Sequence, residues 1–308
     1  MSERSDLLSW RVQNAPTDFH AARVLAHPRF AEAARALAAN SLAAGDNDKA
    51  LAGIQKDAGR YVAAMWAMHL HVSGGLTLPR LKEICAASGF LSPGRARAML
   101  FYMRYLGYIT AAERGRGEPQ RYVPTVSFRQ SWRAQHRAAL EAASVVEPAV
   151  QLVLDRLDED LVLDRISQFQ AEGLLSLSRV RDQQTSLIRI FMHRLAGNQI
   201  IFTLVTQGAG DDFPPYGEIA FSIAAAAQHF GVSRIHIRRI LNDAVREGFM
   251  AFANDGIVVL TEKAREELHT SYAMQLAQLL ASAAEALAQL SGAEPADADR
   301  AALAMAAI

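Results

Sequence analysis

The chain has 308 residues, of which 51% are hydrophobic and 21% are charged. This composition excludes a globally disordered protein, and the length is sufficient for about two domains. The 32 lysines and arginines balance 32 aspartates and glutamates, so the total charge gives no sign of a nucleic-acid partner. Cys85 is the single cysteine, which excludes a disulfide framework. The first residues lack a signal-peptide pattern and no apolar run approaches about 18 residues, so we expect a cytoplasmic chain with no membrane partner.

The spacing of apolar residues predicts a mainly α-helical fold with short β-hairpin wings. In chain order, helices are expected over residues 16–44, 51–72, 129–172 with a break near Pro148, 185–206 with a break at 197–198, and 261–290. Polar, glycine-containing segments at 44–49 and 208–217 predict loops. Two compact blocks, 76–126 and 221–261, have a different pattern and contain the hairpins.

The two compact blocks are copies of one another. A shift of the chain against itself by 141 residues aligns them without a gap. Identical residues then fall at the pairs Ser92/Ser233, Arg97/Arg238, Leu100/Leu241 and Gly107/Gly248. Such self-similarity at a fixed period indicates one supersecondary unit that occurs twice.

The second block has the pattern of a helix-turn-helix. Ser222 is expected to cap a helix over Ile223–Phe230, Gly231 to form the turn, and Ser233 to cap a second helix over Arg234–Gly248. The buried face of the second helix is predicted to carry Ile237, Ile240, Leu241 and Ala244. Its outer face is predicted to carry Arg234, Ile235, Arg238 and Arg239, with His236 at the edge. An apolar underside and a basic outer face are what a DNA-recognition helix requires.

The first block repeats this pattern. A helix over Thr77–Ser88 is followed by the turn 89–91, and Ser92 caps a second helix that has Pro93 in its first turn. Arg95, Arg97 and Arg104 are predicted to point outward. The turn glycine, Gly89, lies one place earlier than Gly231 does in the second block, so the two turns are expected to differ in geometry.

A β-hairpin is predicted after each second helix. In the second block, residues 249–253 and 257–260 are joined through Asp255-Gly256, a strong hairpin signal. In the first block, residues 108–112 and 121–125 flank a longer loop that contains Arg114 and Arg116, and Arg121 begins the return strand. Arginines at a loop tip suit phosphate or minor-groove contacts, whereas the second hairpin has no cation.

Both blocks resemble winged helix-turn-helix domains of bacterial transcription regulators. Residues 76–126 resemble the MarR type, and residues 221–260, with the run Ala-Gln-His-Phe-Gly-Val-Ser-Arg, resemble a general bacterial repressor pattern. The resemblance covers roughly 90 residues and implies DNA binding; regulators of the MarR type are usually dimers through terminal helices. The expected organisation is an N-terminal helical segment (1–50), a first winged domain (51–128), a helical connector (129–184), a second winged domain (185–262), and a C-terminal helix and tail (263–308).

The local charge agrees with DNA binding. Nine arginines lie between residues 92 and 137 against Glu113 and Glu118, whereas residues 141–172 have eight acidic residues against two arginines. The neutral total is therefore expected to arise from a basic surface and an acidic connector. We predict a sequence-specific regulator that binds double-stranded DNA. The predicted DNA contacts are Ser92, Arg95, Arg97, Arg104, Arg114, Arg116, Arg121, Ser233, Arg234, His236, Arg238 and Arg239.

Two winged helices in one chain are also compatible with other functions. A plasmid-type replication initiator could use two winged helices per chain, and a protein-interaction scaffold could use them without DNA. No residue pattern supports an enzyme, a cofactor or a metal site, and the carboxylates 155, 158, 159, 160 and 164 are interpreted as a solvated helix face. Leu276, Leu280, Ala283, Leu287 and Leu290 form a coiled-coil-like seam that predicts a homodimer or packing on the chain's own core. The sequence identifies no effector, and the two copies are expected to act as a pseudo-dimer on one operator.

Overall fold

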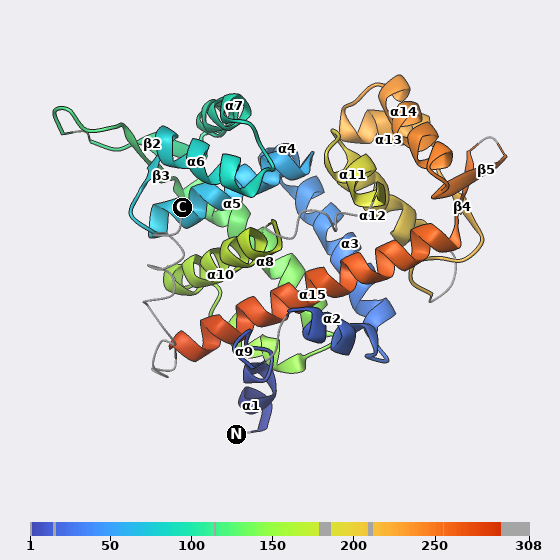
Figure 1. Ribbon diagram of the computed structural model, residues 1–308, viewed down its shortest axis with the longest axis horizontal. Helices are drawn as coiled ribbons and strands as arrows, with labels where there is room; N and C mark the ends of the chain where they lie inside the picture. The colour runs from blue at the N-terminus through green and yellow to red at the C-terminus, as the bar shows by residue number, and fades with distance from the viewer. Residues whose placement is uncertain are drawn as a thin grey trace.

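Helices dominate the structure, and its strands form two small three-stranded antiparallel sheets (Figure 1). The computed structural model describes residues 2–14, 17–113, 115–178, 186–208, 212–254 and 256–290. The prediction of a mainly helical chain with short β-hairpins is confirmed. None of the described helices combines the length and the apolar character that a membrane span requires.

The first sheet lies within a segment that we call the first unit, residues 58–124. Its elements are α5 (Ala58–Val72), β1 (Leu76–Thr77), α6 (Leu78–Ser88), α7 (Pro93–Tyr105), β2 (Ile109–Ala111) and β3 (Arg121–Pro124). The strand order is β1-β3-β2, with Leu76 opposite Tyr122 and Thr110 opposite Val123. The β2–β3 hairpin extends from the rest of the unit and is called the first wing (Figure 1).

The second unit, residues 197–260, has the same order of elements. They are α12 (Gly197–Gln207), β4 (Glu218–Ala220), α13 (Ile223–Phe230), α14 (Arg234–Arg246), β5 (Met250–Asn254) and β6 (Ile257–Leu260). Its strand order, β4-β6-β5, corresponds to that of the first sheet. The β5–β6 hairpin, called the second wing, has a shorter connection than the first wing because residues 255–256 replace residues 112–120.

The repeat extends to individual hydrogen bonds. Helix α14 begins 141 residues after the start of α7 and ends 141 residues after the end of α7. After each wing, Thr125 or Thr261 donates its hydroxyl hydrogen to the carbonyl of Gly107 or Gly248, at 2.7 and 2.8 Å. The same hydroxyl oxygen accepts a hydrogen bond from the first turn of the next helix, α8 (Val126–Ser144) or α15 (Glu262–Leu290). Each copy therefore includes the helix that leaves it.

The remaining helices form a frame beneath the two units. They are α1 (Ser2–Leu8), α2 (Thr17–Leu25), α3 (Phe30–Asn47), α4 (Lys49–Gln55), η1 (Pro148–Val150), α9 (Gln151–Leu154), α10 (Asp160–Ser178) and α11 (Ser186–Met192). Helix α15 crosses this frame from the second unit and packs against α2, α8 and α10 (Figure 1). Its leucine seam, Leu276 to Leu287, is buried within the chain, so this part of the seam is already covered without a second copy.

Several helix boundaries differ from expectation. Helix α3 continues to Asn47 through the polar segment 44–49, because the chain breaks only at Asp48, whose carboxylate caps α4. The expected helix 51–72 is two helices, since Asp57 caps α5 and ends the continuity with α4. The break at Pro148 is confirmed, and a second break separates α9 from α10.

Candidate nucleic-acid interface

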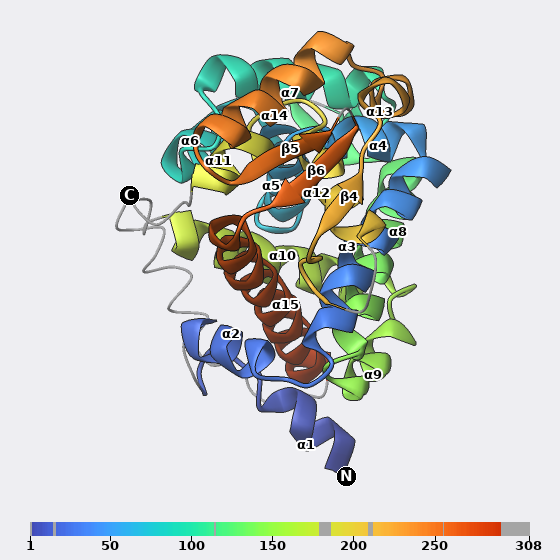
Figure 2. The same cartoon turned by 90° about the vertical axis from the view of Figure 1, so that its right-hand side faces the viewer.

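The two repeat-related helices α7 and α14 lie on the same side of the molecule. Both occupy its upper edge in the two perpendicular views of Figures 1 and 2. The wings extend toward opposite ends of the same side in Figure 1, the first near α6 and the second near the start of α15. Helices α1, α2 and α9 lie on the opposite side.

Helix α7 is amphipathic. Ser92 caps it by accepting a hydrogen bond from the Arg95 amide at 3.3 Å, and Pro93 occupies the first turn, where no amide hydrogen is needed. Its inner face carries four residues that are buried in the core: Ala96, Met99, Leu100 and Met103. Its outer face presents Arg97, Phe101, Arg104 and Tyr105. These residues follow i, i+4, i+7 and i+8 spacing, so the helical periodicity of the sequence would have found the two aromatic members.

The two aromatic rings stand beside the arginines. Tyr105 is 85% exposed and Phe101 is 43% exposed. The Arg97 and Arg104 guanidinium groups lie 5.6 and 6.0 Å from the centroid of the Phe101 ring. This stacking orients the guanidinium planes and leaves their N–H groups at the surface.

Helix α14 has a more basic outer face. Ser233 caps it by accepting a hydrogen bond from the His236 amide at 3.1 Å, and Ile237, Ile240, Leu241 and Ala244 are buried beneath it. Arg234, Arg238 and Arg239 are exposed, and within the described part of the chain none of the three has an ion-pair partner. Ile235, between them, is 72% exposed. Three guanidinium groups without an ion pair thus concentrate positive charge on one exposed face.

Two of the predicted DNA contacts point toward the protein instead. Arg95 and His236 are equivalent in the repeat, and both lie at the third position of their helix. The Arg95 Nη2 is 3.5 Å from Asp57 Oδ1, and the His236 Nε2 is 2.9 Å from the Leu195 carbonyl oxygen. Each of these two contacts holds its helix against the segment before the first helix of its own unit. The geometry therefore favours a positioning role for the Arg95 and His236 side chains over contact with DNA bases. The hydroxyls of Ser92 and Ser233 are likewise engaged as helix caps.

The wings differ in charge. Arg116 is exposed in the loop of the first wing and Arg121 is exposed on β3, whereas Arg114 lies outside the described residues. The second wing has no lysine or arginine, and its exposed apolar residue is Phe252. A groove of about 1110 Å³ is lined by residues of this wing, α12, α13 and α14. Ser222, Ala225, Arg238, Asn242, Phe252 and Asn254 are among the residues that line it.

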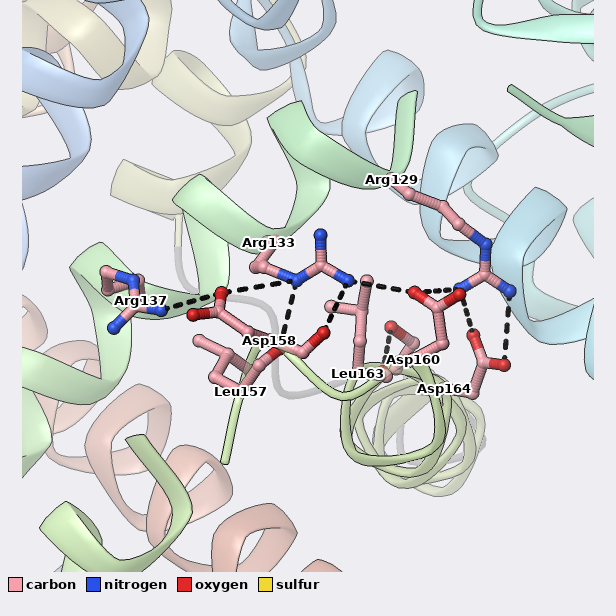
Figure 3. Close-up of polar contacts among 9 residues, drawn as sticks. Arg129, Arg133, Arg137, Leu157, Asp158, Asp160, Leu163 and Asp164 are labelled. Atoms are coloured by element: carbon pink, nitrogen blue, oxygen red, sulfur yellow. Dashed lines mark hydrogen bonds and ion pairs between the residues drawn. The ribbon is translucent and has the colours of Figure 1, made fainter. Parts of the chain in front are cut away.

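The arginines of α8 form ion pairs with aspartates before and on α10 (Figure 3). Arg129 pairs with Asp164 at 2.8 Å, Arg133 with Asp160 at 2.8 Å, and Arg137 with Asp158 at 3.1 Å. The hydrogen bond to Asp164 raises the pKa of Arg129. The interpretation of residues 92–137 as one basic surface therefore needs correction, since three of its nine arginines are neutralised.

The sequence predicts a solvated helix face for Asp158, Asp160 and Asp164. In the structure these three aspartates form a series of ion pairs, here called the ion-pair ladder, that holds the start of α10 against α8. In the described part of the chain, no group of three or more histidine, cysteine or acidic side chains has the arrangement of a metal site. Burial lowers the pKa of His69 and His136 to about 4 and raises that of Cys85 to about 12. These groups are neutral packing residues near pH 7.

Each unit contacts the segment that precedes the other unit. The Phe90 ring, in the α6–α7 turn, lies 6.3 Å from the ring of His193, which precedes α12. Gly231, the repeat equivalent of Phe90, lies beside Lys56, which precedes α5, and a Cβ added there would be 3.5 Å from its Nζ. At the centre, the Ala196 amide donates to the Lys56 carbonyl at 2.7 Å. The turn of each unit thus lies beside the segment that leads into the other unit.

Comparisons with protein-family models, with curated proteins and with solved structures gave no match to this chain.

Proposed function

We propose that this chain is a sequence-specific DNA-binding transcription regulator, in which both units are winged helix-turn-helix domains and α7 and α14 are recognition helices. The order helix–strand–helix–helix–strand–strand, with the first strand paired to the last, supports this assignment in each unit. The proposal involves no enzymatic activity. Its ligand is double-stranded DNA.

The placement of α7 and α14 on one side of the molecule carries the proposal. Recognition helices that faced opposite directions could not bind one duplex, whereas these lie along one edge in both views (Figures 1 and 2). Two recognition helices that enter successive major grooves need a separation of about 34 Å, one turn of DNA. A single chain would then occupy both half-sites of an operator, as a dimer does in simpler regulators.

The charged groups divide into base-reading and backbone-binding sets. Arg97 and Arg238 are equivalent, exposed and central on their helices, which suits the reading of base edges. Arg116 and Arg121 on the first wing suit phosphate or minor-groove contacts. The second wing, without cations, would contribute shape and the groove beside α14.

A second candidate, a protein-interaction scaffold, is favoured by the second wing, where Phe252 is exposed and no lysine or arginine is present. Binding of a fluorescent random-sequence duplex at 50 and 200 mM salt separates the two functions. With about seven free arginines, DNA affinity should fall by roughly a thousand-fold over this range. The double variant Arg97→Ala/Arg238→Ala should bind more weakly, whereas Arg137→Ala, which removes a paired arginine, should bind as the parent does.

Binding that does not depend on salt, or that the double variant leaves unchanged, would favour the scaffold. Sequencing of bound genomic fragments then identifies the target. Promoter fragments are expected, and recovery of a repeated origin sequence would identify a replication initiator instead.

A further inference from the structure

The outer faces of the two recognition helices can be compared position by position, because α7 and α14 align over their full length. Three neighbouring exposed positions are central on each helix. They are occupied by Arg97, Ala98 and Phe101 on α7, and by Arg238, Arg239 and Asn242 on α14. The first position is identical in the two units, and the third differs in chemistry.

These positions lie on one helical face. Residues i, i+1 and i+4 point to the same side of an α-helix within about one turn, so they face adjacent base pairs when the helix lies in the major groove. Met99 and Leu100, which separate them on α7, are buried, as are Ile240 and Leu241 on α14. The two intervening residues of each helix therefore do not reach its outer face.

Each side chain has a distinct base preference. An arginine donates two parallel hydrogen bonds to O6 and N7 of guanine. An asparagine pairs with N6 and N7 of adenine, whereas an apolar ring contacts the methyl group of thymine. Arg97 and Arg238 thus select the same base, while Phe101 and Asn242 select different bases.

We infer that the DNA target consists of two related but unequal half-sites, with a guanine shared by both and a different base next to it in each. The half-site under α7 carries thymine opposite Phe101, and the half-site under α14 carries adenine opposite Asn242. This inference rests on the proposed function. Arg239, which stands where α7 has Ala98, adds one cation to the second half-site.

The stacking of Arg97 on Phe101, 5.6 Å from the ring centroid, links the two readings on α7. The ring supports the guanidinium group that is aimed at guanine and presents its free edge to the next base pair. On α14, Asn242 and Arg238 both line the groove beside the second wing, so the two side chains share one exposed site.

Selection of bound duplexes from a random library tests the inference. The parent chain should select two unequal half-sites with a common guanine. Arg238→Ala should remove the guanine preference in one half-site only, with a loss of affinity of roughly ten- to hundred-fold for the parent site. Phe101→Asn should replace thymine by adenine in the other half-site and thereby make the two halves more alike.

Leu161→Asn is the matched control, because Leu161 is exposed on α10, away from α7, and its replacement should leave the selected sequences unchanged. Thermal unfolding of each variant confirms that its fold is retained. Identical half-sites for the parent, or an unchanged selection with Phe101→Asn, would overturn the inference while DNA binding stands. Failure to enrich any sequence would overturn the proposed function itself.

Discussion

The Arg129 guanidinium group binds both carboxylate oxygens of Asp164, with Nη1 2.8 Å from Oδ1 and Nη2 3.2 Å from Oδ2 (Figure 3). The two side chains are only 17% and 19% exposed, so the pair is mostly shielded from water. It joins α8, which leaves the first unit, to α10 of the frame. Bidentate geometry and partial burial make it the strongest rung of the ladder.

Removal of one partner of this pair should destabilise the protein. We expect Asp164→Asn to lower the free energy of unfolding by about 1–3 kcal/mol, because the partly buried Arg129 then keeps only its longer ion pair with Asp160, at 3.5 Å. A double-mutant cycle with Arg129→Met, followed by urea unfolding, measures the coupling. The Arg137–Asp158 pair, 39% and 82% exposed, is the control and should couple by less than about 1 kcal/mol. Equal coupling in the two pairs would contradict this account.

Loss of a wing arginine should change the salt dependence of DNA binding. Arg116→Ala and Arg121→Ala should each reduce the slope of log affinity against log salt by about 1, because each removes one phosphate contact. Arg137→Ala should leave the slope unchanged, since Asp158 already neutralises that group. Binding measured at four salt concentrations gives the slopes. An equal reduction for all three variants would refute the distinction between the free arginines of the first wing and the paired arginine of α8.

The threonine after each wing should stabilise the protein, because its hydroxyl group both donates and accepts a hydrogen bond. Thr125→Ala removes the cap of α8 and the hydrogen bond to the Gly107 carbonyl, and should cost about 1–2 kcal/mol in stability. Thr261→Ala should have a similar effect at α15. Thr125→Ser retains the hydroxyl and should retain most of the stability in chemical denaturation. A serine variant as unstable as the alanine variant would show that the methyl group, not the hydroxyl, matters.

Stability should decrease on mild acidification. Burial holds the pKa of His136 at about 4, whereas the unfolded chain takes up this proton near pH 6.5. The unfolded state therefore binds more protons between these values, so stability is full above about pH 7 and falls toward pH 4, by up to about 1.4 kcal/mol per pH unit. His136→Gln should reduce this slope in urea unfolding at pH 7.5, 6 and 5, and the contribution of His69, whose pKa is also about 4, should remain. An unchanged slope would contradict the role of His136.

Ala196 combines an unfavourable backbone conformation with full burial. Its φ is 61°, a left-handed conformation that disfavours a Cβ, its side chain is 0% exposed, and its amide donates to the Lys56 carbonyl. We expect Ala196→Gly to leave the free energy of unfolding within about 0.5 kcal/mol of the parent value, because the relief of strain is offset by the loss of the buried methyl group and by the added entropy of the unfolded chain. The same substitution at Ala43, exposed within α3, relieves no strain and should cost about 1 kcal/mol. Thermal unfolding of both variants compares the two changes, and an equal loss at both sites would contradict the strain at Ala196.

Helices, hairpins and the repeat could be predicted because their signals are local. Apolar periodicity identified α7 and α14, and Asp-Gly between apolar runs identified the second wing. Strands β1 and β4 could not be predicted, since they are only two and three residues long and exist through pairing with β3 and β6. The difference between the two turns is confirmed: Gly89 ends α6 and Gly231 ends α13, both in the left-handed conformation, and four residues separate the helices in the first unit against three in the second.

The candidate site was predictable to the level of a helix face but not of each side chain. Arg97, Arg238 and Arg239 are exposed as periodicity predicts. Arg95 and His236 turn toward Asp57 and Leu195, which lie 38 and 41 residues away in the chain, so local spacing carries no sign of these contacts. The pairing of the α8 arginines with α10 depends in the same way on how distant helices pack.

The fusion of two copies in one chain has a genetic consequence. In a homodimer each codon change alters both halves of the molecule at once. Here the halves are encoded separately, so a codon change alters one half while the other keeps its inherited function. The second wing, which has no lysine or arginine, and the longer first wing are differences that a homodimer cannot acquire.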